Sequence, residues 1–115
     1  AVIARVPFDE GALTGQLTKG MSFHPQDWRQ WFFKGRRLDE TVDRVEGLRF
    51  LIRGDLRNLS QAALAFCLAD PAVSTVIPGM RTVAHVEDNV SVSGSGTLTA
   101  EELKTLRGHA WPRNF

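Results

Sequence analysis

A glycine and an arginine that follow a short apolar run have the types and the spacing of an anion-binding loop. Residues 73–77 are a β-branched run typical of a strand buried on both faces, and Gly79 and Arg81 follow it. Thr82 fits a helix N-cap, and a short polar helix is predicted up to Asn89. The loop would then bring free N–H groups, a helix N-terminus and a guanidinium together, which suits an anion. An ordinary strand–turn–helix with a surface arginine has the same local pattern.

A second candidate loop lies near the start of the chain. Residues 1–6 predict a strand that Pro7 ends, and residues 8–15 form a loop with two glycines. Such a loop can surround a phosphate with its N–H groups, although two glycines alone also fit a plain connection. Arg5, at the end of the strand, either extends into solvent or faces a ligand.

Residues 18–37 are predicted to be a long, irregular, aromatic-rich loop within the domain. Loops of this length are uncommon in compact domains and are often functional. The aromatic side chains could cap an apolar pocket or form a satellite core under the loop, and the sequence leaves both open. They are Phe23, Trp28, Trp31, Phe32 and Phe33. The adjacent basic cluster of Lys34, Arg36 and Arg37 is too short for a nucleic-acid patch.

Two helices are predicted in the middle of the chain. Residues 39–52 have apolar residues at helical spacing and acidic residues in the first turn, and Gly54 would end this helix. The next helix would begin with Ser60 as its N-cap and end at Asp70-Pro71. Its predicted buried stripe consists of Ala63, Leu64, Cys67 and Leu68.

The last helix has a clear start signal. Thr99 and Glu102 have the spacing of a capping box, which opens a helix that continues to Arg107 and ends at Gly108. A linker of small residues over 91–97 precedes this helix, and residues 110–115 form a tail.

The composition is that of one small globular domain. The chain has 115 residues and a net charge of +1, so no overall field attracts nucleic acid or a membrane. The single cysteine, Cys67, excludes an internal disulfide and a thiolate metal cluster, and an inert core position fits it best. No apolar run could span a membrane, and no signal peptide is visible. We expect a cytoplasmic protein, and we expect a fragment because the chain begins inside an apolar strand without a methionine.

The order of the predicted elements is strand, loop, two helices, strand, loop and two helices. A strand–helix–strand crossover of this length predicts a parallel, right-handed pair. Two parallel strands cannot cover themselves, so we expect an α/β fold in which further strands complete the sheet. A (β/α)8 barrel without its first six units is the expected host, because loops after the last two barrel strands commonly bind phosphate.

With these residues in view, the chain resembles the C-terminal part of an aldo-keto reductase over nearly its whole length. The most specific part joins Ile77-Pro78-Gly79-Met80-Arg81 to Val86-Glu87-Asp88-Asn89, and residues 2–8 and 11–15 support it. Segments 64–66, 71–76 and 98–103 fit as well. The resemblance implies the C-terminal part of a (β/α)8 TIM barrel: two parallel strands with flanking helices, in one partial domain over residues 1–115.

The resemblance also implies NADP(H) at the barrel mouth. Arg5 would lie against the nicotinamide, where an aromatic ring is more usual. The loop over the pyrophosphate would contain Pro7, Phe8, Glu10, Gly11 and Gln16. Arg29 would clamp the phosphates from the long loop.

The second loop would hold the adenosine end of the cofactor. The resemblance implies that Gly79, Arg81 and His85 lie at the 2′-phosphate, and that Asp88 and Asn89 contact the adenosine. An arginine at a helix N-terminus suits a dianionic phosphate better than a bare hydroxyl, so NADP is favoured over NAD.

The catalytic set of the family is missing from this chain. That set is an Asp, Tyr, Lys and His on earlier strands, whereas this chain has no tyrosine, and His24, His85 and His109 do not match the catalytic histidine. We expect no catalytic residue and no metal ligand here, and no activity from these residues alone. The parent protein would reduce small aldehydes or ketones by hydride transfer. The alternatives are a non-catalytic NADP-binding or structural subunit of this fold, and an incomplete barrel that self-associates.

Overall fold

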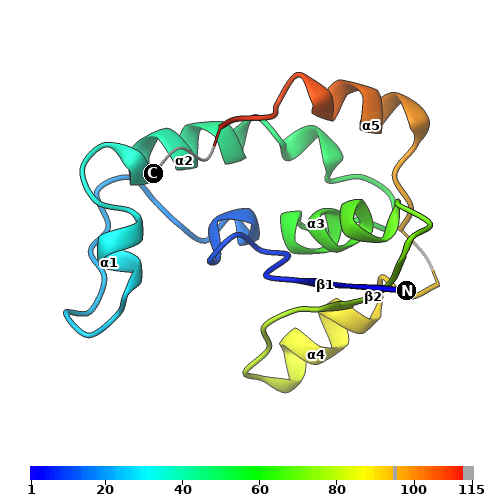
Figure 1. The fold of residues 1–115 in the computed structure, drawn as a ribbon, viewed down its shortest axis with the longest axis horizontal. Helices are drawn as coiled ribbons and strands as arrows, with labels where there is room; N and C mark the ends of the chain where they lie inside the picture. Colours follow the sequence, from blue (N-terminus) through cyan, green and yellow to red (C-terminus); the bar gives the residue numbers. More distant parts are fainter. Residues whose placement is uncertain (95, 113–115) are drawn as a thin grey trace.

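The computed structural model describes residues 1–94 and 96–112. Two short strands lie side by side, with α3 along one side of them and α4 along the other, while α2 and α5 lie beyond α3 (Figure 1). The elements are β1 (Val2–Arg5), η1 (Ala12–Thr14), α1 (Arg29–Phe32), α2 (Arg37–Glu46), η2 (Arg49–Leu51), α3 (Leu59–Leu68), β2 (Val73–Ile77), α4 (Val83–Val90) and α5 (Ala100–Arg107), where η marks a 3₁₀ helix. This arrangement confirms an α/β fold with two parallel strands and flanking helices.

The sheet consists of β1 and β2, which pair in parallel. The register places Ile3 beside Thr75 and ends with Arg5 beside Ile77. Since both strands run in the same direction, the loop after β1 and the loop after β2 leave the sheet at the same edge. The two loops that the sequence singled out are therefore neighbours in space.

The core lies between α2, η2 and α3. Leu56, immediately before α3, has no exposed surface at all, and burial of a leucine stabilises a fold by about 1.5–3 kcal/mol. The other large buried apolar side chains are Phe33, Leu38, Val45, Leu48, Leu51, Leu59, Leu64, Val92 and Leu98. Most of them come from the crossover between the two strands, so this crossover supplies the rigid support behind the sheet.

The predicted helix over residues 39–52 is wrong in its extent. α2 begins at Arg37 and ends at Glu46, with Gly47 as its C-cap. The chain then tightens into η2, and this change of direction turns Leu48 and Leu51 into the core. The apolar periodicity continues across Gly47, but glycine is a poor helix former, and core packing ends the helix there.

The predicted N-cap of the next helix is also wrong. Asn58, not Ser60, caps α3, and its Oδ1 accepts a hydrogen bond from the Gln61 N–H at 2.9 Å. The predicted buried stripe shifts accordingly. Of its members only Leu64 is buried, Ala63 and Cys67 are half-buried, and Leu68 is exposed, while the buried α3 residues are Leu59, Gln61, Ala62, Leu64 and Ala65.

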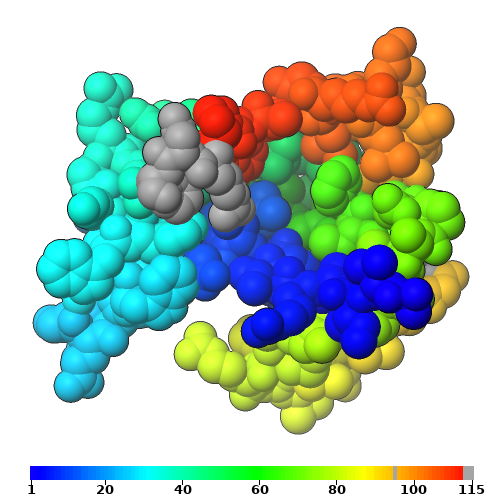
Figure 2. Space-filling model, in the orientation of Figure 1, coloured from blue at the N-terminus to red at the C-terminus, as the bar shows by residue number. Residues whose placement is uncertain are grey.

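The described residues bury neither strand on both faces, although the sequence of β2 is typical of such a strand. Ile3 is 58% exposed and Ile77 is 56% exposed. Figure 2 shows the N-terminal strand lying open on one face of the molecule. An open, mainly apolar groove of about 1010 Å³ runs from the end of β1 along α3 to α5. The described residues thus leave both the sheet and the groove beside it uncovered.

The remaining expectations about the chain ends are partly outside the described residues. Thr99 and Glu102 form the predicted capping box, and α5 ends at Gly108 as predicted. Ser95 of the 91–97 linker and the last three residues of the tail, 113–115, lie outside the described residues. Among the described residues, none of the helices has the length and apolar character needed to cross a membrane.

Candidate functional site

The loop after β1 has an unusual backbone. Val6, Asp9, Glu10 and Gly11 all have positive φ angles, of 54°, 49°, 56° and 94°. Only glycine adopts this region freely, and a β-branched residue such as Val6 is strained there. Such strain is often found where a binding site needs an irregular backbone. This conformation of Val6 could not be predicted from the sequence, because valine favours extended conformations.

The N–H groups of this loop are mostly used within the loop itself. The N–H groups of Asp9 and Gly11 donate to the carbonyls of Val6 and Phe8, and those of residues 12–15 continue the pattern. Among the described residues, the Glu10 N–H donates to no partner. The loop is therefore a preformed, self-supporting turn, and it does not present the ring of free N–H groups that surrounds a phosphate.

Arg29 reaches this loop from the long segment. A Cβ added to Gly11 would lie 3.5 Å from Arg29 Nη1, so the guanidinium covers the glycine. The Asp27 carboxylate accepts hydrogen bonds from Arg29 Nε and, at 2.6 Å, from Nη2, which leaves Nη1 directed at Gly11. The same pair lowers the pKa of Asp27 and raises that of Arg29, since each charge stabilises the other. The carboxylate thus fixes a cation beside the loop.

The other predicted residues of the first loop have mixed environments. Pro7 is buried, Phe8 is half-buried against the core, and Glu10 is half-buried. Gln16 is exposed just beyond η1, and its N–H donates to Thr14 Oγ1. Arg5 is exposed at the end of β1, where it lines the open groove.

The loop after β2 leads directly onto α4. Thr82 caps the helix as predicted, and its Oγ1 accepts from the His85 N–H at 3.1 Å. His85 Nδ1 in turn accepts from the Arg81 N–H at 3.3 Å, which ties the loop to the first turn of α4. The Arg81 side chain is exposed and makes no ion pair with any described residue. A guanidinium and an open helix N-terminus therefore lie together at this edge of the sheet.

Asn89 and Asp88 have different surroundings although they are neighbours in α4. Asn89 Nδ2 donates to the Gly79 carbonyl at 3.5 Å, so this side chain lies at the loop. The Asp88 carboxylate instead accepts from Asn58 and Gln61 of the α3 region. The structure thus brings Gly79, Arg81, His85 and Asn89 together and turns Asp88 away toward α3.

The aromatic residues of the long segment form a satellite core in which three rings take part. Phe33 is buried, with its ring 5.7 Å from Phe23 and 4.8 Å from Phe32. Trp31 is 69% exposed, and Trp28 is 52% exposed although it touches Phe32 edge-on. The short helix α1 interrupts the predicted irregular loop.

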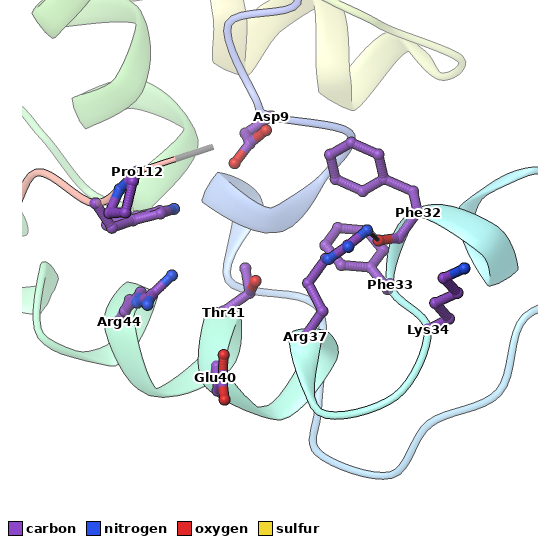
Figure 3. Close-up of a pocket in the computed structure, with 10 residues that line it drawn as sticks. Asp9, Phe32, Phe33, Lys34, Arg37, Glu40, Thr41, Arg44 and Pro112 are labelled. Atoms are coloured by element: carbon purple, nitrogen blue, oxygen red, sulfur yellow. Dashed lines mark hydrogen bonds between the residues drawn. The ribbon is translucent and has the colours of Figure 1, made fainter. Parts of the chain in front are cut away.

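A cavity of about 300 Å³ lies beside this cluster. Asp9 enters it from the loop after β1, while Arg37 and Thr41 approach from α2 and Phe33 from the aromatic cluster (Figure 3). Arg37 Nη1 donates to the Phe32 carbonyl, so this arginine also fastens the aromatic turn to α2. Phe32 and Phe33 thus belong to the satellite core and also line the cavity.

Cys67, His24 and His109 have side chains of types that often take part in catalysis or metal binding. Cys67 is half-buried, and burial raises the pKa of its thiol, which keeps it protonated and unreactive at neutral pH. His24 lies in a loop, where its Nδ1 accepts from the Gln26 N–H, and His109 lies after α5, with its ring 5.5 Å from that of Phe50. Among the described residues, no cluster of histidine, cysteine and acidic side chains could hold a metal ion.

Comparisons with known proteins agree over most of the chain. A family model described as "Aldo/keto reductase family" matches residues 1–110. The chain is similar to "Aldo-keto reductase str7" of Strobilurus tenacellus, with 32% identity over 110 residues that make up 92% of this chain and 32% of that protein. It is also similar to "Uncharacterized oxidoreductase YqkF" of Bacillus subtilis strain 168, with 27% identity over 109 residues, or 95% of this chain and 34% of that protein. The chain spans about a third of the length of these relatives.

Proposed function

The chain belongs to the aldo/keto reductase family of oxidoreductases, and from this premise we propose that it is the cofactor-binding C-terminal part of an NADP(H)-dependent reductase. The whole protein would reduce small aldehydes or ketones by hydride transfer. One observation carries the proposal: the parallel register of β1 and β2 sends both candidate loops out at the same edge of the sheet. In parallel α/β folds, ligands bind at the carboxyl ends of the strands.

The uncovered sheet supports a barrel as the complete fold. β1 has a free edge and exposed apolar side chains on its surface, including Val2 and Ile3. Parallel strands normally have both faces covered and do not remain in pairs. The relatives are about three times as long as the matched region. We infer that further strands of a (β/α)8 barrel pair with β1 and that the preceding helices cover the groove beside it.

The loop after β2 fits the 2′-phosphate of NADP. Arg81 is exposed, the first turn of α4 contains no acidic residue, and the helix dipole favours an anion at that end. Asn89, fastened to the Gly79 carbonyl, would contact the adenosine. Arg29, fixed by Asp27 beside Gly11, would meet the pyrophosphate. Each of the two loops would thus have one cation, Arg29 or Arg81, for the negative charges of a dinucleotide phosphate.

The chain's own part in the reaction would be binding and orientation. When bound, NADPH supplies the hydride. The residues described here would hold the phosphates and the adenosine, and Arg5 at the end of β1 would lie on the side of the nicotinamide. The chain contains no tyrosine, so the proton donor of the family must come from another part of the protein.

Replacement of Arg81 tests this proposal. In the intact protein, Arg81→Ala should weaken NADPH binding by about 1.5–3 kcal/mol, because one charge-assisted contact to phosphate is lost. NADH, which lacks the 2′-phosphate, should bind almost as before. Titration of the wild-type and variant proteins with each nucleotide, followed by fluorescence, measures both affinities.

Arg36→Ala is the matched control. Arg36 is another arginine with a 91% exposed side chain, and it pairs with Glu40 at 3.6 Å. It should leave both affinities unchanged. An equal loss for NADPH and NADH in Arg81→Ala would contradict the assignment of Arg81 to the 2′-phosphate.

A further inference from the structure

Helix α4 is attached to the rest of the chain in an unusual way. The structure describes all of α4, and none of its residues is buried. Val83, Val86 and Val90 are 74%, 41% and 60% exposed. Apolar burial is normally the main force that holds a surface helix in place. Val92, just beyond the helix, is the next buried apolar residue, so the helix itself needs another kind of anchor.

Gln61 provides the centre of that anchor. It lies in the first turn of α3 and is completely buried. Its Nε2 donates to Asp88 Oδ1 and to Ser91 Oγ, both at 2.9 Å, and its Oε1 accepts from the Arg57 N–H at 2.7 Å. A buried amide stabilises a fold only when its hydrogen-bonding groups are satisfied, and Gln61 uses both ends of its amide.

Asn58 strengthens the same link. Its Oδ1 caps α3 through the Gln61 N–H, while its Nδ2 donates to Asp88 Oδ2 at 2.9 Å. Ser91 Oγ donates to the Asp88 carbonyl at 2.7 Å, and Arg57 lies 3.7 Å from the Asp88 carboxylate. We name Asn58, Gln61, Asp88 and Ser91 the α3–α4 clamp. It joins the start of α3 to the last turn of α4 with polar contacts only.

The clamp is continuous with the proposed cofactor site. Asn89 follows Asp88 directly and donates to the Gly79 carbonyl, and the loop from Gly79 leads to Arg81. We propose that Gln61 is a positioning residue, which acts through Asp88 to hold α4 so that Arg81 and Asn89 meet the adenosine end of NADP. This inference rests on the proposed function. It gives Asp88 a structural partner in place of the adenosine contact that the resemblance implied.

Replacement of Gln61 separates positioning from general stability. In the intact protein, Gln61→Leu approximately keeps the side-chain volume and removes the hydrogen bonds of the amide to Arg57, Asp88 and Ser91. The KM for NADPH should rise about tenfold, as expected for roughly one lost hydrogen bond, and kcat should change less than about twofold. The KM for NADH should rise less than that for NADPH, because NADH lacks the 2′-phosphate that Arg81 would meet but keeps the adenosine that Asn89 would contact. Amide hydrogen exchange in α4 without nucleotide should become faster. Thr41→Val, which also replaces a buried polar side chain but in α2 on the far side of α3, should change none of these (Figure 1).

A double substitution that exchanges the amide and the carboxylate tests whether Gln61 acts through Asp88. Gln61→Glu alone places a carboxylate against Asp88 and should impair NADPH binding more than Gln61→Leu does. With Asp88→Asn added, the introduced amide can donate to the introduced carboxylate, which still accepts from the Arg57 N–H. NADPH binding should then return to within about threefold of wild type. If Asp88 contacts the nucleotide directly, the double variant should bind worse than either single variant.

The outcomes separate this inference from the proposed function. A wild-type protein that does not prefer NADPH contradicts the proposed function and removes the role given to the clamp. A wild type that prefers NADPH, together with a folded Gln61→Leu variant of unchanged KM and unchanged α4 exchange, overturns the inference alone. If Gln61→Leu does not fold, Ser91→Ala removes the hydrogen bonds of Ser91 Oγ with Gln61 Nε2 and with the Asp88 carbonyl, at the exposed end of the clamp. It should still raise the KM for NADPH about twofold, and an unchanged KM in that variant counts against the inference.

Discussion

Helices α4 and α5 begin in the same way and differ in what lies at their N-termini. Each runs for eight residues after a threonine N-cap, Thr82 or Thr99, and neither contains a buried residue. In each, the cap hydroxyl accepts from the N–H three residues later, at 3.1 Å. Each also follows a glycine that lies three positions before the cap, Gly79 or Gly96. The local sequence signals for the start of the helix are therefore the same in α4 and α5.

The N-terminus of α5 is closed by the chain itself. Glu101 and Glu102 lie in its first turn, and Glu102 accepts from the Thr99 N–H at 2.7 Å to complete the capping box. Glu102 also forms an ion pair with Arg53 at 2.5 Å. The hydrogen bonds from Arg53 and Thr99 lower the pKa of Glu102 to about 2. A carboxylate thus occupies the positive end of the helix dipole.

The N-terminus of α4 has no such carboxylate. Its first turn contains no acidic residue, and the third helical position is His85 in place of a glutamate. The nearest charged side chain of the loop before it is the cation Arg81. A capped helix can therefore either neutralise its own dipole or leave it for an external anion, and the residue at its third position distinguishes α5 from α4 in this respect.

The largest expected effect comes from giving α4 the capping box of α5. His85→Glu should introduce a carboxylate that accepts from the Thr82 N–H and lies where the 2′-phosphate is proposed to bind. The dissociation constant for NADPH should rise about 10- to 100-fold because of charge repulsion and competition. Without nucleotide, the variant should be more stable by about 0.5–1 kcal/mol. Nucleotide titration and urea unfolding of the intact protein measure the two effects.

The control for this variant places the same charge elsewhere. Thr105→Glu adds a carboxylate at an exposed position of α5, which lies beyond α3 from the sheet (Figure 1), and should leave NADPH affinity close to that of wild type. Tighter binding of NADPH by His85→Glu, or no change, would show that the α4 N-terminus is not the phosphate site. The absence of a carboxylate at the start of α4 would then have no role in nucleotide binding.

The two helix starts were predictable from sequence because capping is local chemistry. Thr82 and Thr99 were identified correctly as N-caps, since a hydroxyl before a helix serves the same purpose in any fold. The two strands and their parallel pairing followed from β-branched runs on either side of a long crossover. Since the strands are parallel, their direction alone predicts that the two loops lie at the same edge of the sheet.

The failures arise where tertiary packing overrides local pattern. The periodicity of residues 39–52 continues through Gly47, yet packing of Leu48 and Leu51 replaces the last turns with a 3₁₀ helix. Ser60 is a good cap by type, but Asn58 has the additional partner Asp88 and takes the position. Gln61 gave no signal at all, because an isolated glutamine early in a helix is usually solvent-exposed.

A smaller effect is expected from opening the N-terminus of α5. Glu102→Gln should lower the free energy of unfolding by about 1 kcal/mol at neutral pH, after allowance for solvent screening of the partly exposed pair with Arg53. The folded pKa of about 2 lies below the usual value of 4.5, so the ionised carboxylate stabilises the fold above about pH 4.5. That contribution is lost as the pH falls from about 4.5 to about 2.

Unfolding measured across this range checks the sign of the effect. The difference in stability between wild type and Glu102→Gln should be constant above pH 5 and should shrink toward zero as the pH falls to 2. NADPH affinity at neutral pH should remain unchanged. A stability difference that persists at low pH would mean that the contact depends on shape or hydrogen bonding and not on the charge.

The smallest effect on stability is expected at the glycine before α4. Gly79 does not have a positive φ, and a Cβ added there would have no atom within 4 Å, so Gly79→Ala should change the free energy of unfolding by less than about 0.5 kcal/mol. The corresponding Gly96 has a φ of 75°, and its added Cβ would lie 2.8 Å from Leu56 Cδ2. Gly96→Ala should therefore cost about 1–3 kcal/mol.

The fold therefore requires a glycine at position 96, whereas at position 79 only a bound ligand could require one. Nothing in the described residues requires a glycine at position 79, so any loss in Gly79→Ala should appear in nucleotide binding alone. If the phosphate approaches the backbone there, the added methyl group should weaken NADPH binding by about three- to tenfold while thermal unfolding is unchanged. Full NADPH affinity in Gly79→Ala would place the phosphate farther along α4, at Arg81 and the first turn, and not against the glycine.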